Sequence, residues 1–246
     1  ISDIQKNPYQ PRKEFSEEKI KELASGQLKD EANAWFVGEP FKVFYDYKKE
    51  GIWQLGEEAT AAANGQEPGD IKVQDVDGNG VITTDDRIIY SQRPDVTFGF
   101  NNTFNYKGFD LSVFLYARLG QWIAYDYNTT YRINALENGG NVDYWTPENP
   151  TNAFPRPNKS KSYTQVTYYS TLKYEDGSFF KIRDITLGYT FKPELLKHLN
   201  LSRLRVYATA KNFFTFSKID NYDPEQGGSI SFPMTKQLVF GLNVEF

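Results

Sequence analysis

Apolar and polar residues alternate along five stretches of the chain, each about ten residues long or longer. Strict alternation is typical of a β-strand with one apolar and one polar face. The pattern predicts strands over 96–107, 109–120, 178–191, 203–216 and 236–246, with a partial strand near 34–47. The fold class expected from this pattern is all-β.

The first two predicted strands are separated by a tight turn at Lys107 and Gly108, as in a β-hairpin. Before the turn, alternate residues from Phe98 to Tyr106 are expected to share one face, and the same holds after it from Phe109 to Leu119. In the third stretch, alternate residues from Phe179 to Phe191 are expected to share a face that includes Lys181 and Arg183.

The predicted strands exceed the usual five or six residues of a soluble sheet and match the length that crosses a bilayer when tilted. Short connections at 107–108 and 192–202 alternate with long segments at 121–177 and 217–235. Short turns on one side, long loops on the other and aromatic residues near strand ends are typical of an outer-membrane barrel. The alternative is a soluble β-sandwich whose aromatic residues fill a core.

The amino-acid composition excludes several classes of function. Phe, Tyr and Trp make up 16 % of the 246 residues, whereas the chain has one Met, one His and no Cys. A chain without Cys has no thiol nucleophile, and His198 has no second histidine or nucleophile elbow to work with, so we expect no enzymatic activity. The net charge of −4 gives no basic footprint for nucleic acid. No apolar run is long enough for a membrane-spanning helix, and no signal peptide opens the chain, as expected of a mature chain or a fragment.

The stretch DVDGNGVITTDD, residues 75–86, has the spacing of a calcium loop, with Gly80 at the sharp turn. The oxygen ligands would come from Asp75, Asp77, Asn79, Val81 through its carbonyl, Thr83 and Asp86. Asp86 is shorter than the usual glutamate, so we expect a weaker or water-completed Ca²⁺ site. The sequences on either side of the loop do not resemble the two helices of an EF-hand. This favours a structural metal ion that stabilises a long loop. The alternative is a solvated polar turn.

Aromatic residues in the segment NVDYWTPENPTNAFPRPN suggest a surface on which sugars could stack, formed by Tyr144, Trp145 and Phe154. Packing within a loop is the alternative for these three residues. The last strand resembles the terminal strand of outer-membrane barrels, which ends on an aromatic residue and often has a glycine five positions earlier. Gly241, Val244 and Phe246 match, and the resemblance implies that the barrel-assembly machinery reads them.

Six stretches resemble, in consistent order over roughly residues 25–246, the C-terminal part of the SusC/RagA family. They are WFVGEPFKVFYDYKKEGIWQ, GDIKVQDVDGNGVITTDDR, RPDVTFGFNNTFNYKGFDLSVFLYARLGQ, LKYEDGSFFKIRDITLGYTF, RVYATAKNFFTFSK and YDPE. This family consists of TonB-dependent outer-membrane transporters of Bacteroidota. The resemblance implies a segment of a large antiparallel transmembrane barrel of about 22 strands with long extracellular loops.

The resemblance also implies partners and a location. A SusD-like lipoprotein would close the outer mouth, and the TonB complex would act through a plug domain outside this sequence. The expected location is the outer membrane of a Gram-negative bacterium, where the barrel would contact lipid. The transported cargo would be a glycan or a peptide. Five strands cannot close a barrel, which needs about eight, so a fragment is expected. The competing function is a soluble, calcium-stapled carbohydrate-binding module.

Residues 1–24, ISDIQKNPYQPRKEFSEEKIKELA, resemble instead the opening of ParB-type chromosome-partitioning proteins. Ser16 and the acidic residues after it predict the start of a short helix. The arginine motif and helix-turn-helix expected of a ParB protein do not follow. We therefore expect two parts, 1–24 of doubtful origin and 25–246 from a barrel, and DNA partitioning is the third alternative.

Overall fold

The computed structural model describes residues 29–41, 43–134 and 139–246. The chain divides into two units, Ile1–Val43 and Phe44–Phe246, and each is described by itself. The segment 1–24 and the helix predicted after Ser16 lie outside the described residues. In the first unit, β1 (Lys29–Asp30) pairs with β2 (Trp35–Phe36) across the 3-10 turn η1 (Glu31–Asn33).

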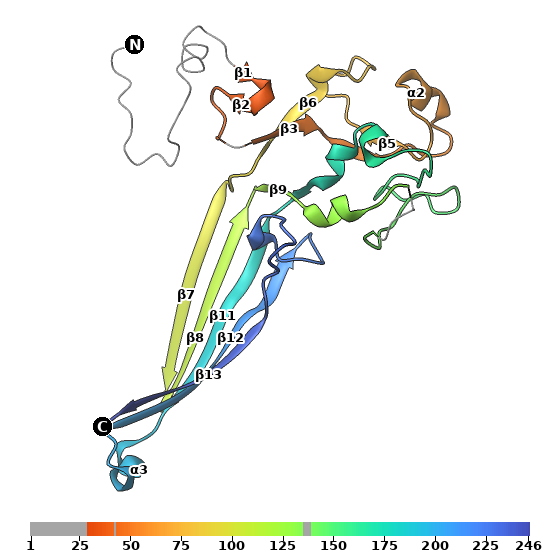
Figure 1. Cartoon of the computed structure of the whole chain (residues 1–246). Coiled ribbons are helices and arrows are strands. Elements are labelled where there is room, and N and C mark those ends of the chain that lie inside the picture. The colour runs from red at the N-terminus through yellow and green to blue at the C-terminus, as the bar shows by residue number, and fades with distance from the viewer. Residues whose placement is uncertain (1–28, 42, 135–138) are drawn as a thin grey trace, which may run out of the picture. The chain divides into compact units, whose positions relative to one another are not determined.

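The second unit is built on a five-stranded antiparallel sheet in the order β13-β12-β11-β8-β7 (Figure 1). Its strands are β7 (Val96–Tyr106), β8 (Phe109–Leu119), β11 (Phe179–Thr190), β12 (Arg203–Ser217) and β13 (Gln237–Glu245). All five strands predicted from the alternation are confirmed, with ends that differ by at most one residue. The partial strand expected near 34–47 is instead divided between β2 and β3 (Val43–Tyr47).

Short connections join neighbouring strands at one end of the sheet. Lys107 and Gly108 both have positive φ, 47° and 90°, which is the backbone of a two-residue hairpin turn. β11 and β12 are joined by α3 (Pro193–Leu196) and the 3-10 turn η6 (Lys197–Leu199). Pro193 opens α3, and Asn200 ends the connection in a left-handed conformation with φ of 52°.

A β-bulge in β11 corrects one expectation from the sequence. The register of β11 shifts between Ile182 and Asp184 against both β8 and β12. The inserted residue, Arg183, breaks the alternation, so Phe179 and Lys181 do not share a face with Ile185, Leu187 and Tyr189. Phe180 and Ile182 take their place on that face, opposite Ala117 and Leu115 of β8.

With the bulge included, one face of the sheet is apolar across all five strands, because directly paired residues point to the same side. One row across the sheet reads Phe109, Tyr189, Val206 and Leu242, and the next reads Leu111, Leu187, Ala208 and Phe240. The opposite face carries mostly polar residues, among them Asn101, Ser112, Thr186 and Thr209. We call the two sides the apolar face and the polar face.

The apolar face is exposed. Phe104, Phe240 and Leu242 are 61 %, 76 % and 68 % accessible, whereas a sandwich would bury such residues against a second sheet. Apart from this sheet, the described residues form only two-stranded sheets. The β-sandwich alternative is therefore wrong. No helix in the described part of the chain is long and apolar enough to cross a membrane.

The other described residues of the second unit, 44–95, 120–134, 139–178 and 218–236, fold into short elements that we call the loop region. Its strand pairs are β3 with β6 (Arg87–Ser91), β4 (Lys49–Ile52) with β5 (Ile71–Val73), and β9 (Trp122–Ala124) with β10 (Tyr174–Asp176). Its helical turns are α2 (Glu58–Ala63), η2 (Thr84–Asp86), η3 (Asp126–Thr130), η4 (Tyr163–Gln165), η5 (Tyr169–Lys173) and η7 (Pro224–Gln226).

Candidate metal site and polar face of the sheet

Three acidic residues of the predicted calcium loop come together in the structure. One carboxylate oxygen each from Asp75, Asp77 and Asp86 lies within 4.8 Å of the others. Gly78 and Gly80 have positive φ, and their backbone N–H groups donate to the Asp75 carboxylate at 2.8 and 2.7 Å. The chain therefore wraps around Asp75, as a loop enclosing a cation would require.

Asp86 is fully buried at the base of this loop. Its carboxylate accepts the backbone N–H groups of Thr83 and Val76, both at 2.7 Å. These hydrogen bonds, that from Thr83 first, hold the pKa of Asp86 below its usual value against the opposing effect of desolvation. Asp86 thus remains a carboxylate in a place where burial alone would favour its neutral form.

The other predicted ligands have local partners. The Asn79 side-chain oxygen accepts the Val81 backbone N–H at 2.7 Å, and the Thr83 hydroxyl accepts the Asp85 N–H at 3.2 Å. Hard oxygen donors of this kind suit Ca²⁺ rather than a softer metal. Ca²⁺ coordination by all six residues stays a prediction.

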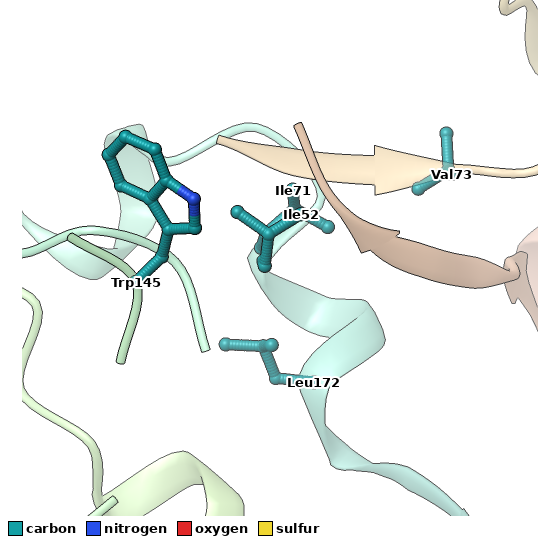
Figure 2. Close-up of a cluster of buried hydrophobic side chains, with 5 residues drawn as sticks. All are labelled: Ile52, Ile71, Val73, Trp145 and Leu172. Carbon is teal, nitrogen blue, oxygen red and sulfur yellow. The ribbon is translucent and has the colours of Figure 1, made fainter. Parts of the chain in front are cut away.

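The metal loop rests on a buried apolar cluster of Ile52, Ile71, Val73, Trp145 and Leu172 (Figure 2). Ile82, inside the loop, packs against this cluster, and its N–H donates to the Asn64 side chain at 3.3 Å. The cluster joins β4, β5, η5 and the segment around Trp145, so it holds parts of the loop region that are about one hundred residues apart in sequence.

The aromatic residues suggested for sugar stacking differ in exposure. Trp145 is only 4 % accessible, and its indole N–H donates to the Gln54 side chain at 2.9 Å. Phe154 is partly buried and packs against the same cluster. Tyr144 is 43 % accessible, so of the three it alone offers a ring to solvent. Packing accounts for Trp145 and Phe154.

An ion pair crosses the polar face of the sheet near the short turns. Arg205 of β12 binds Asp110 of β8 through two hydrogen bonds, at 2.9 and 2.5 Å, across the intervening strand β11. Gly188 lies beneath the pair, and a Cβ there would be 2.5 Å from both side chains. Tyr207 lies over Gly241 in the same way. Gly241, singled out as part of an assembly signal, therefore also makes room for an aromatic ring.

A second charged group, at the opposite end of the polar face, was missed from the sequence. Lys181 is fully buried, and its ammonium lies 2.6 Å from Asp223 and 2.7 Å from Glu225. Arg183 also approaches Glu225, at 3.3 Å. Asp223 and Glu225 belong to the loop 218–235, which the pairs fasten to the sheet. The YDPE motif, residues 222–225, was the available signal.

The remaining predicted residues lie at the end of β13. Val244 is on the apolar face and 41 % accessible, and Phe246 is 93 % accessible beyond the last strand. Their exposure leaves them available for contact, and the assembly role stays a prediction.

The chain has relatives among known proteins. A scan against protein-family models found no match. Two TonB-dependent receptors of Formosa agariphila are each 32 % identical to the chain, over 235 and 233 residues, or 85 % of it. The TonB-dependent receptor SusC of Bacteroides thetaiotaomicron is 31 % identical over 181 residues. The chain belongs to the TonB-dependent receptor family.

This TonB-dependent receptor chain spans 22 %, 23 % and 17 % of the length of those three relatives. The solved structure of the RagAB peptide transporter matches 86 % of the chain with a TM-score of 0.64 at 24 % identity, which shows a common fold. The RagAB peptide importer in its open-open state matches with a TM-score of 0.58 at 26 % identity. The resemblance to SusC and RagA is confirmed at the level of family and fold, and the sheet is a segment of a β-barrel.

Proposed function

We propose that this receptor segment forms part of the wall of a nutrient importer of the SusC/RagA type in the outer membrane of a Gram-negative bacterium. The observation that carries the proposal is the sheet with one exposed apolar face and one polar face. The apolar face would contact lipid, and the polar face would line the lumen. Exposing these aromatic and aliphatic side chains to water is unfavourable, and contact with lipid would remove that free-energy cost.

Strand length supports this placement. β7 and β8 have 11 residues each, or about 36 Å at 3.3 Å per residue. Tilted by about 45°, such a strand covers about 26 Å, close to the apolar band of an outer-membrane barrel. The short connections would then face the periplasm and the loop region the outside. No step of catalysis is proposed for this chain.

The resemblance to the SusC/RagA family also implies partners. A SusD-like lipoprotein would meet the loop region, and the TonB complex would act through the plug domain of the complete receptor. The cargo would be a glycan or a peptide, as the resemblance to the SusC/RagA family implies, and the RagAB structure is described as that of a peptide transporter. The two cargo classes are separated by supplying the complete receptor with either as the sole nutrient.

Charge on the apolar face provides the test of membrane placement. Phe240→Arg puts a charge in the lipid-facing row, which costs about 2–4 kcal/mol near the middle of a membrane. We expect the complete receptor to be depleted from the outer membrane and uptake to fall. Val239→Arg, one residue away on the polar face, is the control and should retain both. Normal insertion and uptake of Phe240→Arg would contradict the proposal.

We also propose that residues 75–86 bind Ca²⁺ and so stabilise the loop region. Asp75, Asp77 and Asp86 would supply carboxylate oxygens, with Asn79, Val81 and Thr83 completing the set. Asp86→Asn removes the buried charge and should weaken Ca²⁺ binding by about tenfold or more. Asp85→Asn is the matched control, because Asp85 lies outside the three-carboxylate group. Calorimetry on both variants measures the effect, and equal affinities would rule the site out.

The pH dependence of this site has a definite sign. The pKa of Asp86 is lowered, so its contribution to folding is present above the ordinary aspartate pKa of about 4. That contribution is lost as the pH falls through the lower folded value. Ca²⁺ protection of the segment against proteolysis should therefore persist at pH 5 and disappear in stronger acid.

A further inference from the structure

The apolar face contains a hollow near the short connections. Its volume is about 520 Å³, and its lining includes Phe109, Leu187, Tyr189, Val206, Phe240 and Leu242. Ala208 of β12 forms the floor, because its small side chain stands between Leu187 of β11 and Phe240 of β13. Ala210, the next residue of β12 on this face, continues the row of small side chains between Ile185 and Leu238.

The shape and lining of the hollow suit a linear hydrocarbon chain. The lining side chains carry no charge, and the low row along β12 runs between taller residues on both sides. Each methylene group removed from water into such a site contributes about 0.8 kcal/mol. The hollow is also continuous with the face that contacts lipid in the proposed barrel, so a lipid is the occupant most directly supplied to it.

Two exposed lysines, Lys107 and Lys192, which we call the cationic rim, lie in the short connections at the same end of the sheet. The Lys107 ammonium is 5.1 Å from the centroid of the Tyr106 ring, and Tyr106 is 69 % accessible on the apolar face. The Thr190 N–H donates to the Gly108 carbonyl at 2.8 Å, which brings this turn beside the end of β11. Lys192 follows two residues later and is also exposed.

The acidic residue nearest to Lys107 in sequence does not neutralise this rim. Asp110 is turned to the polar face, where Arg205 binds it through two hydrogen bonds. The Lys107 side chain can therefore extend its ammonium group toward the interface while its stem covers apolar surface.

We propose that the hollow and the rim together bind one anionic phospholipid. An acyl chain occupies the hollow along β12, and the phosphate lies at Lys107 and Lys192. The proposal rests on the membrane placement given above, in which the short connections face the periplasm. The lipid would then belong to the periplasmic leaflet of the outer membrane.

The test uses the complete receptor in detergent micelles with equimolar phosphatidylglycerol and phosphatidylcholine, and native mass spectrometry counts the retained lipids. The wild-type receptor should retain phosphatidylglycerol about tenfold more often than phosphatidylcholine, a ratio equivalent to about 1.4 kcal/mol. Ala208→Phe fills the hollow and should abolish retention of both lipids. Lys107→Asn combined with Lys192→Gln should remove the preference, and asparagine is chosen because it tolerates the positive φ of position 107.

Matched controls separate this site from general effects. Val96→Phe adds bulk at the other end of the apolar face, and Lys159→Gln removes a charge in the loop region, so both should behave as wild type. Ala208→Leu gives a smaller filling change should the phenylalanine variant fold poorly.

Equal retention of the two lipids by the wild-type receptor, or unchanged preference in the lysine variant, would overturn the headgroup site. Unchanged retention in both Ala208 variants would leave only general boundary lipid. If the wild-type receptor retained no lipid of either kind and Phe240→Arg inserted normally, the membrane placement itself would fail.

Discussion

Lys181→Met is expected to release the loop 218–235 from the polar face, at a local cost of about 3–5 kcal/mol. Lys181 is fully buried between Asp223 and Glu225, which are themselves only 11 % and 9 % accessible. Removing the ammonium leaves two carboxylates close together with Arg183, at 3.3 Å from Glu225, as the remaining cation. Uncompensated buried charge is among the most costly defects in a folded protein.

Hydrogen exchange of the loop amides in the purified complete receptor measures this release. Lys211→Met is the control, because Lys211 is half exposed and 3.9 Å from Asp184, so its loss should cost less than about 1 kcal/mol. Adding Asp223→Asn and Glu225→Gln to the Lys181 variant should restore part of the protection. Equal exchange in the Lys181 and Lys211 variants would show that the buried pairs do not fasten the loop.

Trp145→Ala is expected to destabilise the loop region by about 3–5 kcal/mol, the range for removing a buried aromatic side chain. The ring packs with Ile52, Ile71 and Leu172, and its N–H binds Gln54. Its loss would open a cavity in the cluster and leave the Gln54 oxygen without this donor. Because Ile82 packs on the same cluster, the metal loop should loosen as well.

The control for Trp145→Ala is Tyr144→Ala, which removes an exposed ring from the neighbouring position. We expect Tyr144→Ala to change local stability by less than about 0.5 kcal/mol. Exchange of the amides of β4, β5 and η5 provides the measurement. Similar, small effects for both variants would contradict the assignment of Trp145 to the core, and would return it to the ligand-binding candidates.

The five long strands were predictable because alternation over ten or more residues is a local signal. The hairpin turn at Lys107 and Gly108 was also predictable, because the conformation of a two-residue turn depends on the residues at its two central positions. The division of 34–47 into two short strands was not predicted, although Gly38 and Pro40 interrupt that stretch.

The bulge at Arg183 was not predictable from alternation, because it is defined by pairing with β8 and β12 rather than by β11 alone. The error placed Lys181 on the wrong face and so concealed its partners. Asp223 and Glu225 lie about forty residues later in the sequence, and no local pattern predicts that their loop contacts the sheet.

The candidate metal loop, unlike the bulge, could be predicted from local sequence. Its acidic residues lie within twelve positions, so spacing alone predicted the group of Asp75, Asp77 and Asp86 that the fold brings together. The burial of Trp145 was not visible in sequence, because its partners Ile52, Ile71 and Leu172 come from three distant segments. A tryptophan beside an exposed tyrosine gives the same local pattern in a core and at a binding surface.

Accessibility along β13 tests most directly whether the sheet is a membrane wall. The chain has no cysteine, so single cysteines at 238 to 240, 242 and 243 place spin labels in this segment without interference from a native thiol of the chain. In the complete receptor in lipid bilayers, labels at Leu238, Phe240 and Leu242 should collide with oxygen dissolved in the lipid. Labels at Val239 and Asn243 should collide instead with a water-soluble nickel complex. A period of two is the predicted result, and uniform access to the nickel complex at all five positions would contradict the account.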